Sequence, residues 1–106
     1  MQNIFFSRQN NNQFNRQTIT ANATNQDLQN ITSDISYMLN YVNQLNQHIF
    51  EASNQQIKTM LTNIRNSIQV HIGELMSLLF SLDPNFYEQF QLGLEQGDSI
   101  IKGNIN

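Results

Sequence analysis

The sequence predicts an all-α protein, and three observations lead to this prediction. An apolar stripe at helical spacing runs from residue 27 to residue 82. Within that stretch Gly73 is the one glycine, and no proline occurs before Pro84. A shorter apolar row follows Pro84. We therefore expect a long amphipathic helix or a helical hairpin over about 26–82, a short C-terminal helix over about 84–96, and an extended or disordered N-terminal arm.

The apolar stripe is most regular in its first half, where the steps alternate between three and four residues. This spacing is typical of a coiled-coil seam and excludes a strand. Asn is a poor helix former, so a helix this rich in Asn needs tertiary packing of its stripe to be stable. The stripe consists of Leu28, Ile31, Ile35, Met38, Val42, Leu45, Ile49, Ile57, Met60, Ile64, Ile68, Ile72, Leu75, Leu79 and Leu82.

The stripe is interrupted between Ile49 and Ile57, which are eight residues apart instead of seven. Such a phase shift fits a stutter in one continuous helix or a turn between two helices. The intervening segment has no Gly or Pro, and only Ser53 and Asn54 favour a break. A continuous helix of roughly 55 residues would be on the order of 80 Å long. Both alternatives remain open, and the hairpin has the advantage that the chain itself covers the stripe.

The helix ends carry recognisable signals. Thr24 or Asn25 is the expected start, because Asp27 then lies in the first turn and complements the helix dipole. Asp83 and Pro84 end the long element and begin the next helix, as N-cap and first residue. This C-terminal helix is expected to stop near Gly97 and to fold back on the surface of residues 75–82, using Phe86, Phe90 and Leu94 on one face.

The segment 75–82 is apolar around much of its circumference, which predicts cover on several sides. Gly73 just before it would let another helix approach closely. We expect this end of the molecule to be the centre of the core or of an oligomer interface. The predicted core or interface residues are Phe5, Phe6, Leu75, Met76, Leu79, Phe80, Leu82, Phe86, Phe90 and Leu94.

Residues 1–23 form the expected arm, and residues 24–106 form a single helical domain. The arm begins with an apolar plug that contains Phe5 and Phe6, followed by a tract of Asn and Gln at 9–13. It has no helical or strand period and cannot bury enough apolar surface to fold alone. It is interpreted either as a docking arm for a neighbouring subunit or for the helical body, or as a disordered tail.

The composition narrows the possible partners. The chain holds 17 Asn and 14 Gln residues, only 12% charged residues, and a net charge of −3. The five basic residues are scattered, so we expect no nucleic-acid interface. No apolar run reaches the ~20 residues of a membrane span, and the start lacks the pattern of a secretory signal. Localisation stays open between cytoplasm, virion and export without a cleaved signal.

Little in the sequence points to catalysis or cofactors. Two strings, His48 to Glu51 and His71 to Glu74, each place an imidazole and a carboxylate on one helix face. Helical bundles use such pairs to bind metals, but further carboxylates at suitable spacing are absent. No phosphate loop or nucleophile motif is present. We expect no enzyme, cofactor or metal site.

The function expected from these features is a non-enzymatic structural or assembly protein that associates with itself or docks into a larger complex, for example a virion or a filament. The alternative is a small helical-hairpin binding module or secreted partner protein. A metal-binding bundle is the third and weakest interpretation. The seam, the uncharged polar faces, the aromatic arm and the apolar tail of Ile100, Ile101 and Ile105 support the first.

Overall fold

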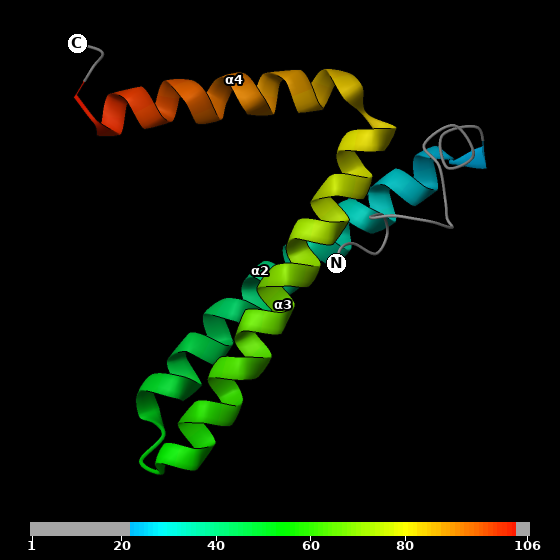
Figure 1. Ribbon diagram of the computed structural model, residues 1–106. Coiled ribbons are helices and arrows are strands. Elements are labelled where there is room, and N and C mark those ends of the chain that lie inside the picture. The colour runs from blue at the N-terminus through cyan, green and yellow to red at the C-terminus, as the bar shows by residue number, and fades with distance from the viewer. Residues whose placement is uncertain (1–21, 104–106) are drawn as a thin grey trace, which may run out of the picture.

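The structure, a computed structural model, describes residues 22–103. It consists of three helices, α2 (Asn25–Glu51), α3 (Gln55–Leu82) and α4 (Pro84–Ile101). Helices α2 and α3 lie side by side as a hairpin, and α4 turns away from its open end (Figure 1). The described part of the chain has no strand, and the all-α prediction is confirmed.

The start of α2 lies where the sequence predicts it. Thr24 is the N-cap, and its hydroxyl oxygen accepts a hydrogen bond from the Asp27 backbone N–H at 3.1 Å. The Asp27 carboxylate accepts one in return from the Thr24 backbone N–H at 2.9 Å. This reciprocal capping box satisfies two backbone donors that the helix itself leaves without partners.

The hairpin turn spans Ala52 to Asn54, so the long stripe forms two helices. Ala52 adopts an extended conformation and ends α2, while its N–H still bonds the carbonyl of His48. Asn54 begins α3, because its side-chain oxygen accepts from the Ile57 N–H at 3.0 Å. An Asn cap therefore starts the second helix without any glycine or proline.

The core of the hairpin lies between α2 and α3, and it is small. The buried apolar residues are Ile35, Val42 and Leu45 on α2 and Leu79 on α3. The other α2 stripe residues are all half-buried. The predicted seam of α2 is therefore the surface that α3 covers.

Helix α4 contacts α3 only near their junction, where Asp83 alone separates the two helices. The expected fold-back onto residues 75–82 is wrong beyond this junction, because antiparallel helices normally need about 2–5 linking residues. Gly97 does not end the helix, which continues to Ile101. The chain instead leaves the helix at Gly103, whose φ of 78° lies in the left-handed region that glycine tolerates.

Candidate interaction surface

The first half of α3 exposes apolar residues that the sequence assigns to the buried stripe. Ile57, Met60 and Ile64 are 52%, 63% and 43% exposed. Leu61 and Arg65, which lie at neighbouring angular positions, are half-buried instead. The expectation that Ile57, Met60 and Ile64 are buried is therefore wrong for the single chain. After the turn, α3 is rotated about its axis so that Leu61 and Arg65 lie toward α2.

Arg65 lies at the contact between α2 and α3 because side-chain amide oxygens accept hydrogen bonds from its guanidinium. Its Nη1 donates to Asn46 Oδ1 of α2 at 2.9 Å. Its Nε and Nη2 donate to Asn66 Oδ1 at 3.3 and 3.0 Å. An arginine at a contact between two helices is tolerated when its donors are bonded and its alkyl stem packs.

A groove lies between α2 and α3 toward the open end of the hairpin. Tyr37 and Met38 of α2 and Leu75 and Leu78 of α3 form its apolar lining. Its polar lining comes from Asp34, His71 and Glu74. The Tyr37 ring is 72% exposed and stands beside this groove as a large unburied side chain.

The exposed residues of α3 continue the side of the hairpin on which this groove lies. Ile57 and Leu75 are eighteen residues apart, as are Met60 and Leu78, and eighteen residues make five helical turns. On α2, Tyr41 lies one turn after Tyr37 and is 37% exposed. We call this surface the hairpin face. It comprises Tyr37, Met38, Tyr41, Ile57, Met60, Ile64, Leu75 and Leu78.

The aromatic residues predicted near the α3–α4 junction do gather there. The Phe80 ring lies 5.6 Å from Phe86, 5.2 Å from Tyr87 and 5.0 Å from Phe90, measured between centroids. Phe86 and Phe90 are 5.8 Å apart. Tilted and edge-on pairs of this kind contribute about 0.5–1.5 kcal/mol each beyond area burial. The cluster fixes the direction in which α4 leaves the hairpin.

The other predicted core or interface residues have different surroundings. Leu79 is buried, and Leu75, Met76 and Leu82 are half-buried. Leu94 is 55% exposed on the free part of α4. Phe5 and Phe6 lie outside the described residues. The exposure of Tyr37 was not predicted from the sequence. Its position beside the apolar stripe favoured burial, whereas the side chain is 72% exposed.

The two His and Glu pairs behave differently. His71 Nδ1 lies 2.8 Å from Glu74 Oε1. Glu51 instead accepts a hydrogen bond from Gln47 Nε2 at 2.6 Å. Between residues 22 and 103 no three His, Cys, Asp or Glu side chains gather closely enough to hold a metal ion.

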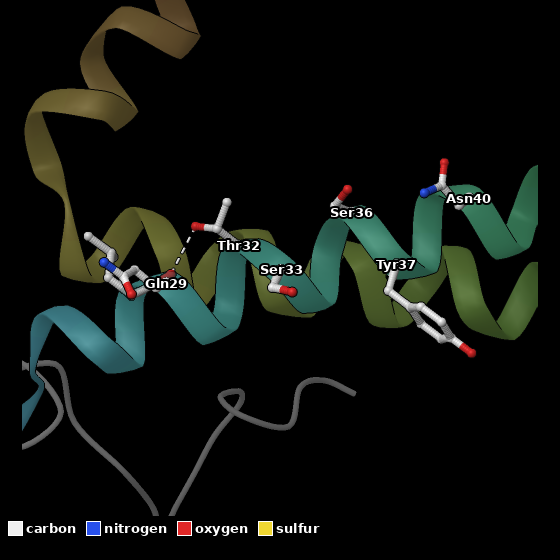
Figure 2. Close-up of a pocket in the computed structure, with 7 residues that line it drawn as sticks. Gln29, Thr32, Ser33, Ser36, Tyr37 and Asn40 are labelled. Atoms are coloured by element: carbon white, nitrogen blue, oxygen red, sulfur yellow. Dashed lines mark hydrogen bonds between the residues drawn. The ribbon is translucent and has the colours of Figure 1, made fainter.

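A second hollow lies along the outer side of α2, from Leu28 to Asn40 (Figure 2). Its hydroxyl and amide side chains come from a single helix, and Thr32 Oγ1 donates to the Leu28 carbonyl at 2.9 Å. In Figure 2 the Tyr37 ring points away from Ser36 and Asn40. Because these polar groups do not converge on one point, the hollow has no catalytic arrangement.

Comparison with protein-family models, with curated proteins and with solved structures gives no match. No helix in the described range 22–103 is long and apolar enough to span a bilayer. The surface chemistry of the helices is therefore the basis for a functional proposal.

Proposed function

We propose that this chain is a non-enzymatic structural or assembly protein that works by associating with copies of itself or by docking into a larger protein complex. The observation that carries the proposal is the exposed apolar row of Ile57, Met60 and Ile64. These residues continue a helical seam by sequence, yet neither α2 nor α4 covers them. Contiguous apolar patches of this kind mark protein interfaces.

The free part of α4 supports the same proposal. Helix α4 leads away from the hairpin (Figure 1), and Leu94 and Ile101 are 55% and 86% exposed. An isolated helix of this length is marginal in water, and Gly93 and Gly97 weaken it further. A partner that covers α4 would stabilise it, which is how an assembly subunit gains order from its neighbours.

Substitutions on α3 test this function. Met60→Lys and Ile64→Lys place charges on the hairpin face, where desolvation in an interface is costly. Val70→Lys is the control, because Val70 is 62% exposed on the same helix but does not belong to the hairpin face. Sedimentation should show a smaller assembly for the first two variants and the parental size for the control. Equal sizes for all three variants and the parent would contradict a role of this row in assembly.

The alternative, a small helical-hairpin binding module, is favoured by one observation. The groove of Tyr37, Met38, Leu75 and Leu78 is open and could receive a segment of another protein. A chain that is monomeric at every concentration would support this alternative over self-association.

A further inference from the structure

We propose that two copies of this chain pack their hairpin faces together, antiparallel, to form a four-helix bundle. This inference rests on the proposed function, because it specifies the partner and the arrangement of the association. The partner is a second copy of this chain.

Helix α4 cannot cover the hairpin face of its own chain. Only Asp83 links it to α3, and Pro84 follows at once. The contacts of Phe80 with Phe86 and Phe90 hold α4 near the α3 terminus. The covering helices must therefore come from elsewhere, and a second hairpin supplies two of them.

The exposed apolar area of the hairpin face is considerable. Exposed fractions of 37–72% on Tyr37, Tyr41, Ile57, Met60 and Ile64 correspond to apolar surface on the order of several hundred Å², as large as the largest patch of a typical monomer. A stable dimer takes about 800 Å² from each partner, including its polar rim. The apolar part of the hairpin face therefore supplies a substantial share of such an interface.

The two halves of the hairpin face have complementary shapes. The half of the face near the open end has the groove of Met38, Leu75 and Leu78. The half near the turn has the protruding side chains of Ile57 and Met60. An antiparallel pair places the protruding half of each copy against the groove half of the other, so one two-fold axis satisfies both surfaces. Tyr41 and Ile64, in the middle, lie nearest that axis.

The direction of the pair also fixes which helices meet. A two-fold axis that makes the hairpins antiparallel lies across the helices in the plane of the interface, so α2 lies against α2 of the other copy and α3 against α3. The shallow apolar hollow at the start of α3 therefore faces the other copy's α3 near Leu75. This hollow is lined by Ile57, Met60, Leu61 and Ile64, among neighbouring polar residues.

Charge also bears on the direction of the pair. Asp34, Glu74 and His71 line the groove half, and His71 is paired with Glu74 at 2.8 Å. A parallel pair lays α2 of one copy against α3 of the other at the same level, which would bring the Asp34 and Glu74 carboxylates of the two copies together. The antiparallel pair instead places Glu74 beside the start of α3, where Ile57 and Met60 are uncharged. Repulsion between like charges therefore favours the antiparallel direction.

Cysteine cross-linking tests the arrangement cleanly, because the chain contains no cysteine. An Ile64→Cys chain is treated with a mild oxidant. Two copies should form a disulfide, since Ile64 lies nearest the two-fold axis and α3 of one copy lies against α3 of the other. Ile57→Cys should stay uncross-linked, because it lies about 10 Å along the helix from Ile64, which places its two copies farther apart than the about 7 Å between Cα atoms that a disulfide spans. Val70→Cys, exposed on α3 outside the hairpin face, is the control.

The outcomes distinguish this inference from the proposed function. A disulfide of Ile64→Cys, with none of Ile57→Cys or Val70→Cys, supports the antiparallel pair. A mixed disulfide between Tyr37→Cys and Leu75→Cys chains would indicate a parallel pair and overturn the inference, because a parallel two-fold pair lays α2 of one copy against α3 of the other at the same level. An oligomeric parent chain without the Ile64→Cys disulfide would also overturn it, while self-association stands. A parent chain that is monomeric at every concentration would contradict both the pair and self-association.

Discussion

The Arg65 guanidinium of α3 donates a hydrogen bond to the side-chain oxygen of Asn46 on α2, with 2.9 Å between Nη1 and Oδ1. This bond joins the two helices in the half of the hairpin near the turn, where α3 turns Ile57, Met60 and Ile64 outward. A polar contact therefore adds to the apolar packing of the buried Leu45 in this half of the hairpin. The exposed row of Ile57, Met60 and Ile64 is thereby left available to a partner.

Arg65→Ala should lower the free energy of unfolding by about 0.5–1.5 kcal/mol, because it removes this hydrogen bond and the packing of the alkyl stem. Urea denaturation at fixed protein concentration measures the change. Asn63→Ala is the control on the exposed side of α3, and it should leave stability unchanged or slightly higher because Ala is the better helix former. Equal stability of Arg65→Ala and the parent would show that the Arg65–Asn46 contact does not contribute.

Leu79 is the buried residue of α3, with 7% of its surface exposed. Leu79→Ala should destabilise the hairpin by about 2–5 kcal/mol, through lost burial and the remaining cavity. Leu79→Asp should abolish folding or assembly, because it buries an unpaired carboxylate. Circular dichroism and solution mass check both variants, with Val70→Asp as the exposed control. Unchanged helicity and mass in Leu79→Asp would refute the core assignment.

Asp83 is the N-cap of α4, and its carboxylate accepts a hydrogen bond from the Phe86 N–H at 3.0 Å. Asp83→Ala should cost about 0.5–2 kcal/mol, since this backbone donor loses its partner. Asp83→Asn should retain most of the stability, because Asn caps helices about as well as Asp. Thermal unfolding followed by circular dichroism distinguishes the two. Similar losses for both variants would indicate that the charge of Asp83 matters more than its cap.

Gly73 lies inside α3, and a Cβ atom built on it meets nothing within 4 Å. The close helix approach expected at this glycine does not occur within the described chain. Gly73→Ala should therefore raise the free energy of unfolding by up to about 1 kcal/mol, because Ala loses less conformational entropy in a helix. Urea denaturation measures this gain. A loss of assembly in the same variant would instead mean that a partner helix packs against Gly73.

The apolar plug with Phe5 and Phe6 lies outside the described residues, and its predicted role as a docking arm is tested by deletion. Removal of residues 1–17 should weaken assembly, measured as solution mass at several concentrations. The circular dichroism signal per remaining helical residue should stay the same, because α2 to α4 begin after the deletion. An unchanged assembly state would leave the arm without a role in association.

Local signals in the sequence predict the helix boundaries well. Thr24 with Asp27, and Asp83 with Pro84, cap the helices by short-range hydrogen bonds and steric restrictions that neighbouring residues determine. Asn54 also favours a break, but without Gly or Pro nearby the hairpin could not be separated from a continuous helix. The end of α4 is missed, because a glycine inside a helix costs only about 1 kcal/mol and Gly97 does not stop it.

The orientation of α3 about its own axis is the part that the sequence could not predict. Its apolar residues cover more than half of the helix surface, so periodicity allows either Ile64 or Leu61 with Arg65 to face α2. The choice depends on the turn geometry and on the Asn46 partner of Arg65, both of which are tertiary features. The exposed hairpin face follows from this choice, and periodicity alone could not identify it.

The absolute mass of the unmodified chain in solution tests the central claim most directly. Size-exclusion chromatography with light scattering over a wide concentration range gives it without a shape assumption. Self-association predicts a mass of at least twice the 12.3 kDa of one chain, rising with concentration if α4 adds further contacts. A constant mass of 12.3 kDa at every concentration would contradict the self-association on which the account depends.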